Sequence, residues 1–231
     1  GIPLYCPVVP LGAHDSWNTA FGEIPLMDLF RYSGGRLLAE GVDVERIAAE
    51  VGTPAYVYSR GTFEDHLRKM QEAYRDLDPL ICFAVKACGN LHILRLMAGL
   101  GSGFDIVSGG ELYRVLQAGG DPAKVVYAGV GKTDEEIVDA IRAGIGYFNI
   151  ESEQELENLI RLVELHGGGR ARPKAALRVN PDVDYRSHAY LETGKKETKF
   201  GVDIERAVSV FDAYAGNPAV RLCAVHVHLG T

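Results

Sequence analysis

The sequence predicts an α/β fold in which a parallel sheet closes as a (β/α)8 TIM-type barrel, of which this chain supplies about six βα units. From Leu80 onward, short apolar strands alternate with amphipathic helices, and successive strands begin about 22 residues apart until an insertion lengthens the last interval. Strict alternation with short connections gives a parallel sheet, which is either open or closed into a barrel.

Polar residues at the predicted strand ends favour the closed form. Lys86, Asp105, Arg178 and His228 end or lie in different predicted strands. In a barrel the carboxyl ends of the strands converge on one mouth, whereas an open sheet concentrates such residues at one switch point. Because a barrel of this type has eight strands, we expect the chain to be the N-terminal portion of a longer protein.

The predicted elements follow from apolar patterning and turn residues. Residues 1 to about 34 contain four prolines and suggest a lead-in held by other parts of the protein. A strand-like piece with glycine turns follows, then a helix over residues 44–51 that ends at Gly52, and a short strand over residues 55–58. Strands of the barrel are expected at residues 80–86, 103–107, 125–128, 147–150, 175–179 and 220–228. Helices are expected at residues 91–99, 109–118, 134–143, 152–166 and 203–214.

A lysine ends the first of these apolar strands. Alternation would place Lys86 on one face with Cys82 and Ala84, so neither face of this strand is a solvated one. A buried ammonium must be paired, neutralised or used covalently, because burial disfavours its charge and a neutral amine forms a Schiff base with an aldehyde. The alternative is a strand-end lysine whose ammonium reaches water.

Other polar and charged residues at the predicted strand ends and the following helix have specific chemical requirements. Asp105, in a short buried strand, requires a cation or a hydrogen-bond donor, which Lys86 or a cationic cofactor would supply. Ser108 with Glu111 three residues later predicts a capping box at the start of a helix. Arg178 carries a planar fork suited to a carboxylate or a phosphate, and it could equally pair with a structural acid.

Two motifs have simpler interpretations. The run Gly-Val-Gly-Lys-Thr at residues 129–133 lacks the first glycine of a P-loop, because position 126 is Val126, so we expect a helix start capped by Thr133. His226 and His228 have a metal-ligand spacing and could also stack on a ring. Since no cluster of His, Asp or Glu accompanies them at the strand ends, we expect no metal.

Composition excludes several classes of function. The 231 residues carry a formal net charge of -7, and the 24 Lys and Arg are dispersed among 31 Asp and Glu, so nucleic acid is not an expected partner. No apolar run is long enough to cross a membrane and the N-terminus lacks signal-peptide order, so we expect no membrane association and a cytoplasmic protein. The four cysteines lack CxxC spacing and are expected to be reduced thiols without zinc.

Several segments together resemble the diaminopimelate decarboxylases. They are FAVKA at residues 83–87, FDIVSGGE at 104–111, GVGKT at 129–133, NIES at 149–152, LRVNP at 177–181, TG and KFG at 193–194 and 199–201, and HVHLG at 226–230. Their order and spacing agree from about Leu37 to Thr231. The resemblance implies an enzyme that depends on pyridoxal 5'-phosphate, with an alanine-racemase-like barrel and a second, β-rich domain built from both chain ends. Residues 1–58 would contribute to that domain and residues 59–231 would form the partial cofactor-binding barrel.

The same resemblance implies roles for individual residues. Lys86 would hold pyridoxal phosphate covalently and His228 would stack on its ring, which makes these two the expected catalytic residues. Asp105 and Glu111 would belong to the polar shell around them. Arg178 would support the cofactor side of the mouth.

The implied reaction is decarboxylation of meso-2,6-diaminopimelate to L-lysine and CO2, the last step of lysine biosynthesis, in a homodimer with shared active sites. Thr231, where relatives often have serine, would lie near the phosphate, and the rest of the phosphate site would lie beyond it, so we expect the chain alone to be inactive. Alternatives are a decarboxylase for ornithine, arginine or carboxynorspermidine, a non-catalytic pyridoxal-phosphate-binding protein, and a metal-dependent barrel hydrolase that uses His226 and His228.

Overall fold

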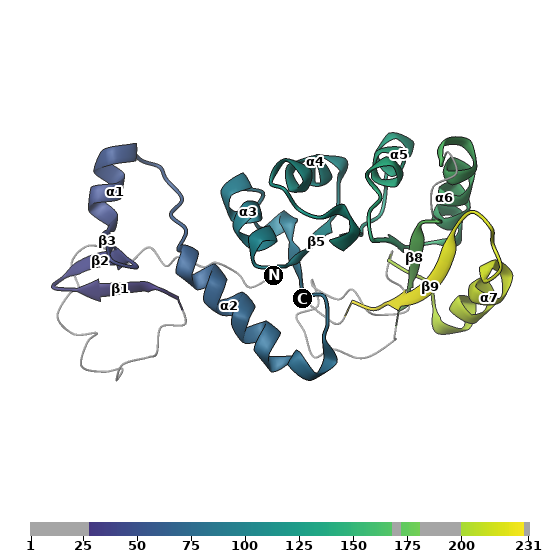
Figure 1. The fold of residues 1–231 in the computed structure, drawn as a ribbon, viewed down its shortest axis with the longest axis horizontal. Helices are drawn as coiled ribbons and strands as arrows, with labels where there is room; N and C mark the ends of the chain where they lie inside the picture. Colours follow the sequence, from purple (N-terminus) through teal and green to yellow (C-terminus); the bar gives the residue numbers. More distant parts are fainter. Residues whose placement is uncertain (1–27, 168–171, 181–199, 229–231) are drawn as a thin grey trace. The chain divides into compact units, whose positions relative to one another are not determined.

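The computed structural model describes residues 28–167, 172–180 and 200–228 (Figure 1). The chain divides between Pro79 and Leu80 into two compact units, which are described separately. In the part of the chain so described, no helix is both long enough and apolar enough to cross a membrane.

The first unit contains a small antiparallel sheet and two helices. Its elements are β1 (Phe30–Ser33), β2 (Arg36–Ala39), β3 (Val42–Asp43), α1 (Val44–Val51) and α2 (Arg60–Ala73). Ser33 pairs with Arg36, so Gly34 and Gly35 alone make the hairpin turn. Their φ angles of 57° and 75° lie in the left-handed region that the two central residues of such a turn require.

Two features of this unit differ from the expectation. The helix Val44–Val51 is confirmed, but residues 55–58 form no strand, and Tyr56 is 91% exposed. Helix α2 was not predicted, because Leu67 is its only buried residue and charged side chains hide the apolar period. Ser59 begins this helix by accepting a hydrogen bond from the backbone N–H of Thr62 at 3.0 Å.

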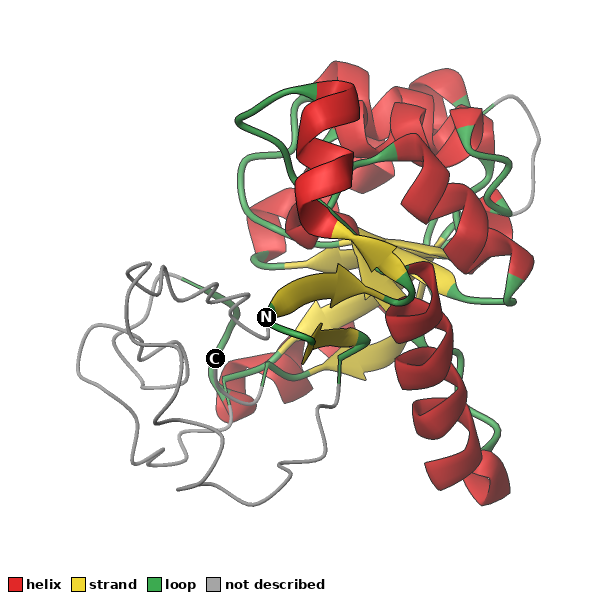
Figure 2. Ribbon diagram, turned by 90° about the vertical axis from the view of Figure 1, so that its left-hand side faces the viewer, coloured by secondary structure: helices red, strands yellow, loops and turns green. Residues whose placement is uncertain are grey.

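The second unit is a curved parallel sheet covered by helices (Figures 1 and 2). Its strands are β4 (Cys82–Ala84), β5 (Gly103–Ile106), β6 (Val125–Tyr127), β7 (Tyr147–Ile150), β8 (Lys174–Arg178) and β9 (Arg221–His226). Its helices are α3 (Leu91–Gly99), α4 (Gly109–Gln117), α5 (Asp134–Ala143), α6 (Glu153–His166) and α7 (Ile204–Tyr214). Short 3-10 turns cover Arg75–Leu77 in the first unit and Val85–Ala87 and Pro122–Lys124 in the second.

Strand order distinguishes a barrel from an open doubly wound sheet. The six strands are adjacent in chain order and every neighbouring pair is parallel, whereas a doubly wound sheet reverses its order at a switch point. Consecutive helices from α3 to α6 pack against one another along the outer side of the sheet (Figure 1). The predicted α/β barrel architecture is confirmed as an arc of six strands, and within the described residues β4 and β9 are its two edges.

Large side chains on one face of the sheet pack beneath the helices. Phe104, Tyr127 and Phe148 lie on neighbouring strands and are at most 1% exposed. The rings of Tyr127 and Phe148 stack with centroids 6.4 Å apart. Burial of each such side chain contributes about 1.5–3 kcal/mol to folding. The sheet is therefore a rigid support for the loops that follow its strands.

All six expected strands and five expected helices of the barrel are present, and β7, α3 and α5 have the expected bounds. The first strand is shorter than expected, because β4 pairs with β5 only as far as Ala84 and Asp105. Beyond Ala84 the chain turns, and the N–H of Cys88 donates to the carbonyl of Val85 at 3.0 Å. The last strand likewise ends at His226, two residues before the expected end.

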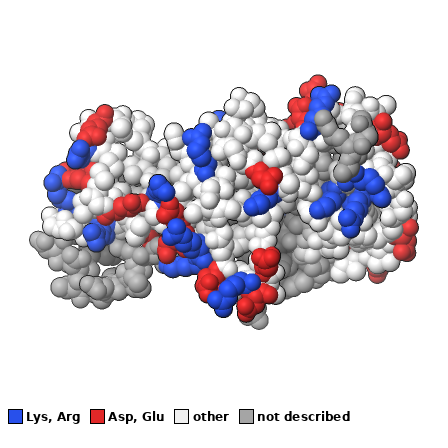
Figure 3. Space-filling view, viewed as in Figure 1, with Lys and Arg blue, Asp and Glu red and all other residues white. Residues whose placement is uncertain are grey.

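Charged side chains of both signs share the molecular surface. On the face drawn in Figure 3, Lys and Arg form small groups, some beside Asp and Glu and some without them, separated by uncharged surface. A continuous stripe of one sign, which binding to a phosphate backbone requires, is not seen on this face.

Candidate active site

The expected site residues lie at the carboxyl ends of neighbouring parallel strands. Lys86 follows β4, Asp105 lies in β5, Arg178 ends β8, and His226 ends β9 two residues before His228. Arg178 and His226 are direct partners across the two strands. Because all the strands are parallel, these ends lie on one edge of the arc.

Lys86 lies in a turn and is exposed, so the expectation of a lysine buried in a strand is wrong. The hydrogen-bonded ladder stops at Ala84, and the 3-10 turn places only Val85, 1% exposed, in the core. Burial therefore gives no reason for a reactive amine in this chain. The case for a reactive Lys86 therefore rests on its position at a strand end, where the charged groups Asp105 of β5 and Glu111 of α4 belong to the same electrostatic environment.

Asp105 is an acid whose pKa is affected by Lys86. Burial raises the pKa of Asp105 above its ordinary value, Lys86 lowers it, and Glu111 raises it. The three charged groups therefore interact, as the sequence led us to expect for Lys86 and Asp105. Glu111 is held in place because its Oε2 accepts a hydrogen bond from the N–H of Val107 at 2.7 Å.

The expected capping box at the start of α4 is only partly present. Ser108 Oγ accepts a hydrogen bond from the N–H of Glu111 at 3.2 Å, as predicted. The carboxylate of Glu111 binds the N–H of Val107 instead of that of Ser108. The next helix, α5, has the full capping box, formed by Thr133 and Glu136, which confirms the predicted helix start there.

Arg178 forms a buried ion pair with Glu151, the residue that follows β7. The side chains of Arg178 and Glu151 are 9% and 2% exposed, and Nη1 of the arginine lies 3.0 and 3.2 Å from the two carboxylate oxygens. The guanidinium carbon also lies 4.9 Å from the ring centroid of Phe200. The arginine is thus fixed at the strand end by a structural acid, one of the two alternatives that the sequence left open.

Both histidines of β9 and its continuation are biased towards the neutral form. Burial lowers the pKa of His226 and of His228, and the positive charge of Arg178 lowers both further. Lys86 also lowers the pKa of His228. Lys86, Arg178 and His228 therefore share one electrostatic environment. The Nδ1 atom of His226 is buried and makes no hydrogen bond within the described residues.

Three charged residues at the strand ends were not singled out from the sequence: Lys132, Glu151 and Glu155. Lys132 and Glu155 form an ion pair at 2.5 Å, and their side chains are 2% and 14% exposed. For Glu151 a signal existed, because a carboxylate directly after the buried strand Tyr147–Ile150 needs a partner for the same reason as Asp105. Thr231, an expected cofactor-binding residue, lies outside the described residues.

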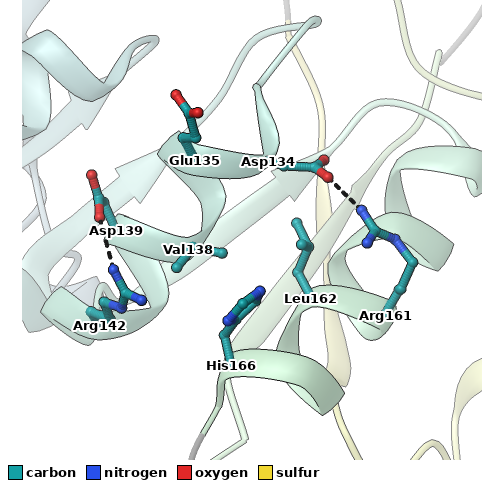
Figure 4. A pocket seen from close by; sticks show the side chains of 8 residues that line it. All are labelled: Asp134, Glu135, Val138, Asp139, Arg142, Arg161, Leu162 and His166. Carbon is teal, nitrogen blue, oxygen red and sulfur yellow. Dashed lines mark hydrogen bonds and ion pairs between the residues drawn. The ribbon is translucent and has the colours of Figure 1, made fainter.

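In the part of the chain that the structure describes, neither a metal-binding cluster nor a depression between α5 and α6 indicates another site. Within the described residues, no group of three or more His, Cys, Asp and Glu side chains is arranged to hold a metal ion. A shallow depression lies between α5 and α6 (Figure 4), where Arg161 contacts Asp134 at 2.5 Å beside His166. Its walls are helix surfaces, so it is separate from the strand ends.

Comparison with known proteins agrees with this geometry. The family model described as "Pyridoxal-dependent decarboxylase, pyridoxal binding domain" matches residues 60–231. The chain is 48% identical over 205 residues to the diaminopimelate decarboxylase of Pseudomonas aeruginosa, covering 89% of this chain and 49% of that protein. It is 46% identical over 206 residues to that of Haemophilus influenzae, with the same coverage. The chain thus spans about half the length of the curated relatives it matches.

Solved structures show the same fold. The diaminopimelate decarboxylase of Helicobacter pylori in complex with L-lysine is 36% identical, with a TM-score of 0.76 over 81% of this chain and 47% of that one. The enzyme of M. jannaschii in co-complex with L-lysine is 33% identical, with a TM-score of 0.79 over 87% and 48%. The family model covers most of the chain, including every strand end described above. This chain therefore belongs to the pyridoxal-dependent decarboxylases and contains their pyridoxal-binding domain.

Proposed function

We propose that this chain carries the cofactor-binding part of a diaminopimelate decarboxylase, which converts meso-2,6-diaminopimelate to L-lysine and CO2. The relatives named above support this substrate, and two of the similar solved structures contain L-lysine. The observation that carries the proposal is the meeting of Lys86, Asp105, Arg178 and His228 at one edge of the sheet, where their charges act on one another.

The residues present fit pyridoxal phosphate. Lys86 offers an exposed primary amine for covalent attachment of an aldehyde. Burial is the main cause of the lowered pKa of His228, and the positive charges of Arg178 and Lys86 lower it further, so two cations act at this edge and suit a phosphate and a substrate carboxylate. Pyridoxal phosphate, when bound, supplies an electron-accepting ring that stabilises the charge left on the α-carbon as CO2 departs.

Each side chain has a distinct task in this arrangement. His228 is neutral at pH 7, so its ring can lie against an aromatic ring without burying a charge. Glu151 holds Arg178 in one orientation, which fixes the position of its positive charge. Asp105 interacts electrostatically with both Lys86 and Glu111, so these two acids form the polar surroundings of the strand end that carries Lys86.

We further propose that the complete enzyme is a cytoplasmic homodimer with shared active sites and a small amino acid as its substrate. The resemblance of the motifs supports the dimer. Light scattering of the purified complete enzyme measures its mass in solution directly. A monomer under the assay conditions would contradict an active site shared between two subunits.

Cofactor binding tests the proposal on the chain itself. Titration of the 231-residue chain with pyridoxal phosphate should produce a new absorbance band near the edge of the visible range, which borohydride abolishes. The band should be absent in Lys86→Ala and retained in Lys124→Ala, a control at the opposite end of the sheet. An unchanged band in Lys86→Ala would rule out attachment at Lys86.

The substrate is tested separately. The chain is joined at the matched boundary to the C-terminal half of the Pseudomonas aeruginosa relative, and CO2 release is measured with meso-diaminopimelate, L-ornithine and L-arginine. We expect release from meso-diaminopimelate in the joined protein and none from the 231-residue chain alone. Release from ornithine or arginine instead would assign a related decarboxylase, and cofactor attachment without any release would favour a non-catalytic binding protein.

A further inference from the structure

We propose that Lys132 is a positioning residue, which holds the Glu151–Arg178 pair at the strand ends through Glu155. Neither the sequence motifs nor the proposed reaction gives this lysine a task. The effect of Lys132 on cofactor binding rests on the proposed function, whereas the effect of Lys132 on the geometry of the strand ends does not depend on it.

Lys132 is buried and fully engaged. Only 2% of its side chain is exposed, and its Nζ donates to the carbonyls of Gly129 at 2.7 Å and Asn149 at 2.9 Å and to Glu155 Oε1 at 2.5 Å. Nζ also lies 5.3 Å from the centroid of the Tyr127 ring. The ammonium therefore ties the loop after β6 to the end of β7 and to the first turn of α6.

Glu155 passes this restraint on to the next strand end. Its second oxygen, Oε2, accepts a hydrogen bond from the N–H of Glu151 at 2.9 Å. The carboxylate of Glu151 in turn binds Nη1 of Arg178 at 3.0 and 3.2 Å. A continuous chain of contacts thus runs from Lys132 through Glu155 and Glu151 to Arg178, across the ends of β6, β7 and β8.

Local structure does not explain why a charge is buried here. The start of α5 is already capped by Thr133 and Glu136, so the helix does not need the lysine. Burying an ammonium is unfavourable unless it is paired, and an apolar side chain of similar length would fill the same space. The charge is needed because Glu151 and Glu155 are linked carboxylates that each require a cation: Arg178 pairs with Glu151, and Lys132 pairs with Glu155.

The same charges act on the histidine at the end of β9. Arg178 lies opposite His226 in the register of β8 and β9, and the charged groups that act on His226 are Arg178, Glu151, His228 and, least, Lys132. Removing Lys132 takes away a positive charge and leaves Glu155 without its cation. The pKa of His226 should therefore rise, and this readout does not require any cofactor.

The test uses four forms of the 231-residue chain: wild type, Lys132→Met, the double variant Lys132→Met/Glu155→Gln, and the control Lys124→Met. The control makes the same chemical change at the amino end of the same strand, β6. The double variant removes the unpaired charge but keeps an oxygen that can accept from the N–H of Glu151. Circular dichroism checks that each form is folded, and pyridoxal-phosphate affinity and the His226 titration by NMR are then measured.

We expect Lys132→Met to bind pyridoxal phosphate about 10-fold more weakly or worse, because a displaced positioning group affects binding far beyond its own contacts. The double variant should recover most of that loss and the control should match wild type. Wild-type affinity in Lys132→Met, or a double variant as weak as the single one, would overturn the inference. If Lys132→Met does not fold, the double variant decides: near wild-type affinity supports the link through Glu155, and weak binding contradicts it.

Failure of the proposed function would look different. A wild-type chain that binds no pyridoxal phosphate would contradict the proposed function, and the inference would then be decided by His226 in the cofactor-free chain. A raised pKa of His226 in Lys132→Met that returns towards the wild-type value in the double variant supports the link. An unchanged pKa in Lys132→Met refutes it.

Discussion

Replacing Glu151 with alanine tests the buried ion pair between Glu151 and Arg178. The substitution removes the carboxylate that binds Nη1 of Arg178 at 3.0 and 3.2 Å, and it leaves a guanidinium that is 9% exposed without its partner. Removing one partner of a buried ion pair typically costs about 3–5 kcal/mol, because the remaining charge stays desolvated. We therefore expect Glu151→Ala to lower the free energy of unfolding by about this amount.

The size of this effect is large for a protein of ordinary stability. Total stability of about 5–15 kcal/mol means that at least about a fifth of it is lost. In a domain of this size each kcal/mol corresponds to about 2–4 °C in Tm, so the expected decrease is about 6–20 °C. Urea denaturation followed by far-UV circular dichroism measures the free energy, and a thermal scan measures Tm.

Two further variants identify the cause. Glu151→Met/Arg178→Met removes both charges and should restore stability to the wild-type level or above, since the desolvation penalty disappears with them. Arg161→Ala breaks the exposed pair with Asp134 and should change stability much less. A decrease of less than about 1 kcal/mol in Glu151→Ala, or a double variant less stable than the single one, would refute the reasoning.

Three other predictions follow from the titration of buried groups. Burial raises the pKa of Asp105, so the contribution of Asp105 to stability falls as the pH rises from the unfolded pKa of 3.8 through the folded pKa. Asp105→Asn should therefore raise Tm at pH 7 in a thermal scan, and a lower Tm would contradict this reasoning. Burial lowers the pKa of His226 and His228, so the unfolded chain binds more protons and stability is lost as the pH falls below the unfolded pKa of 6.5. His226→Gln should reduce the difference between the urea midpoints at pH 7 and pH 5.5, and an unchanged difference would exclude His226 as a cause of the pH dependence. Burial raises the pKa of Cys82 to about 11, so iodoacetamide at pH 8 should modify the exposed Cys223 well before Cys82. Mass spectrometry follows the order of modification, and the reverse order would contradict the burial of Cys82.

The periodic part of the fold could be read from the sequence. From β4 to β9 the strands and helices alternate at regular spacing, and turn and capping residues mark most of their ends, so every element was found. Helix α2 was missed because it buries only Leu67, which leaves no apolar stripe to detect. The ends of β4 and β9 were overestimated because a strand stops where its pairing stops, and pairing depends on the neighbouring strand.

Several residues at the strand ends were singled out from the sequence, but their physical state was not predicted. Lys86, Asp105, Arg178 and His228 stand out because they are titratable or charged residues in or at the ends of apolar strands, and the motif resemblance gave Glu111 a place beside them. The exposure of Lys86 matches the alternative that the sequence left open, and it depends on a turn that begins one residue earlier, at Val85. The Lys132–Glu155 pair was not predicted, because a lysine in a glycine-containing loop is normally exposed to solvent. Only the structure shows the three oxygen atoms that accept hydrogen bonds from its ammonium.

The central claim, that Lys86 is the attachment point of pyridoxal phosphate, is tested most directly by peptide mapping. The 231-residue chain is incubated with pyridoxal phosphate, reduced with borohydride, digested and analysed by mass spectrometry. The account predicts a single phosphopyridoxyl group on the peptide containing Lys86, with Lys132 unmodified because its ammonium is buried and paired. Modification spread over exposed lysines, or an unmodified Lys86, would contradict it.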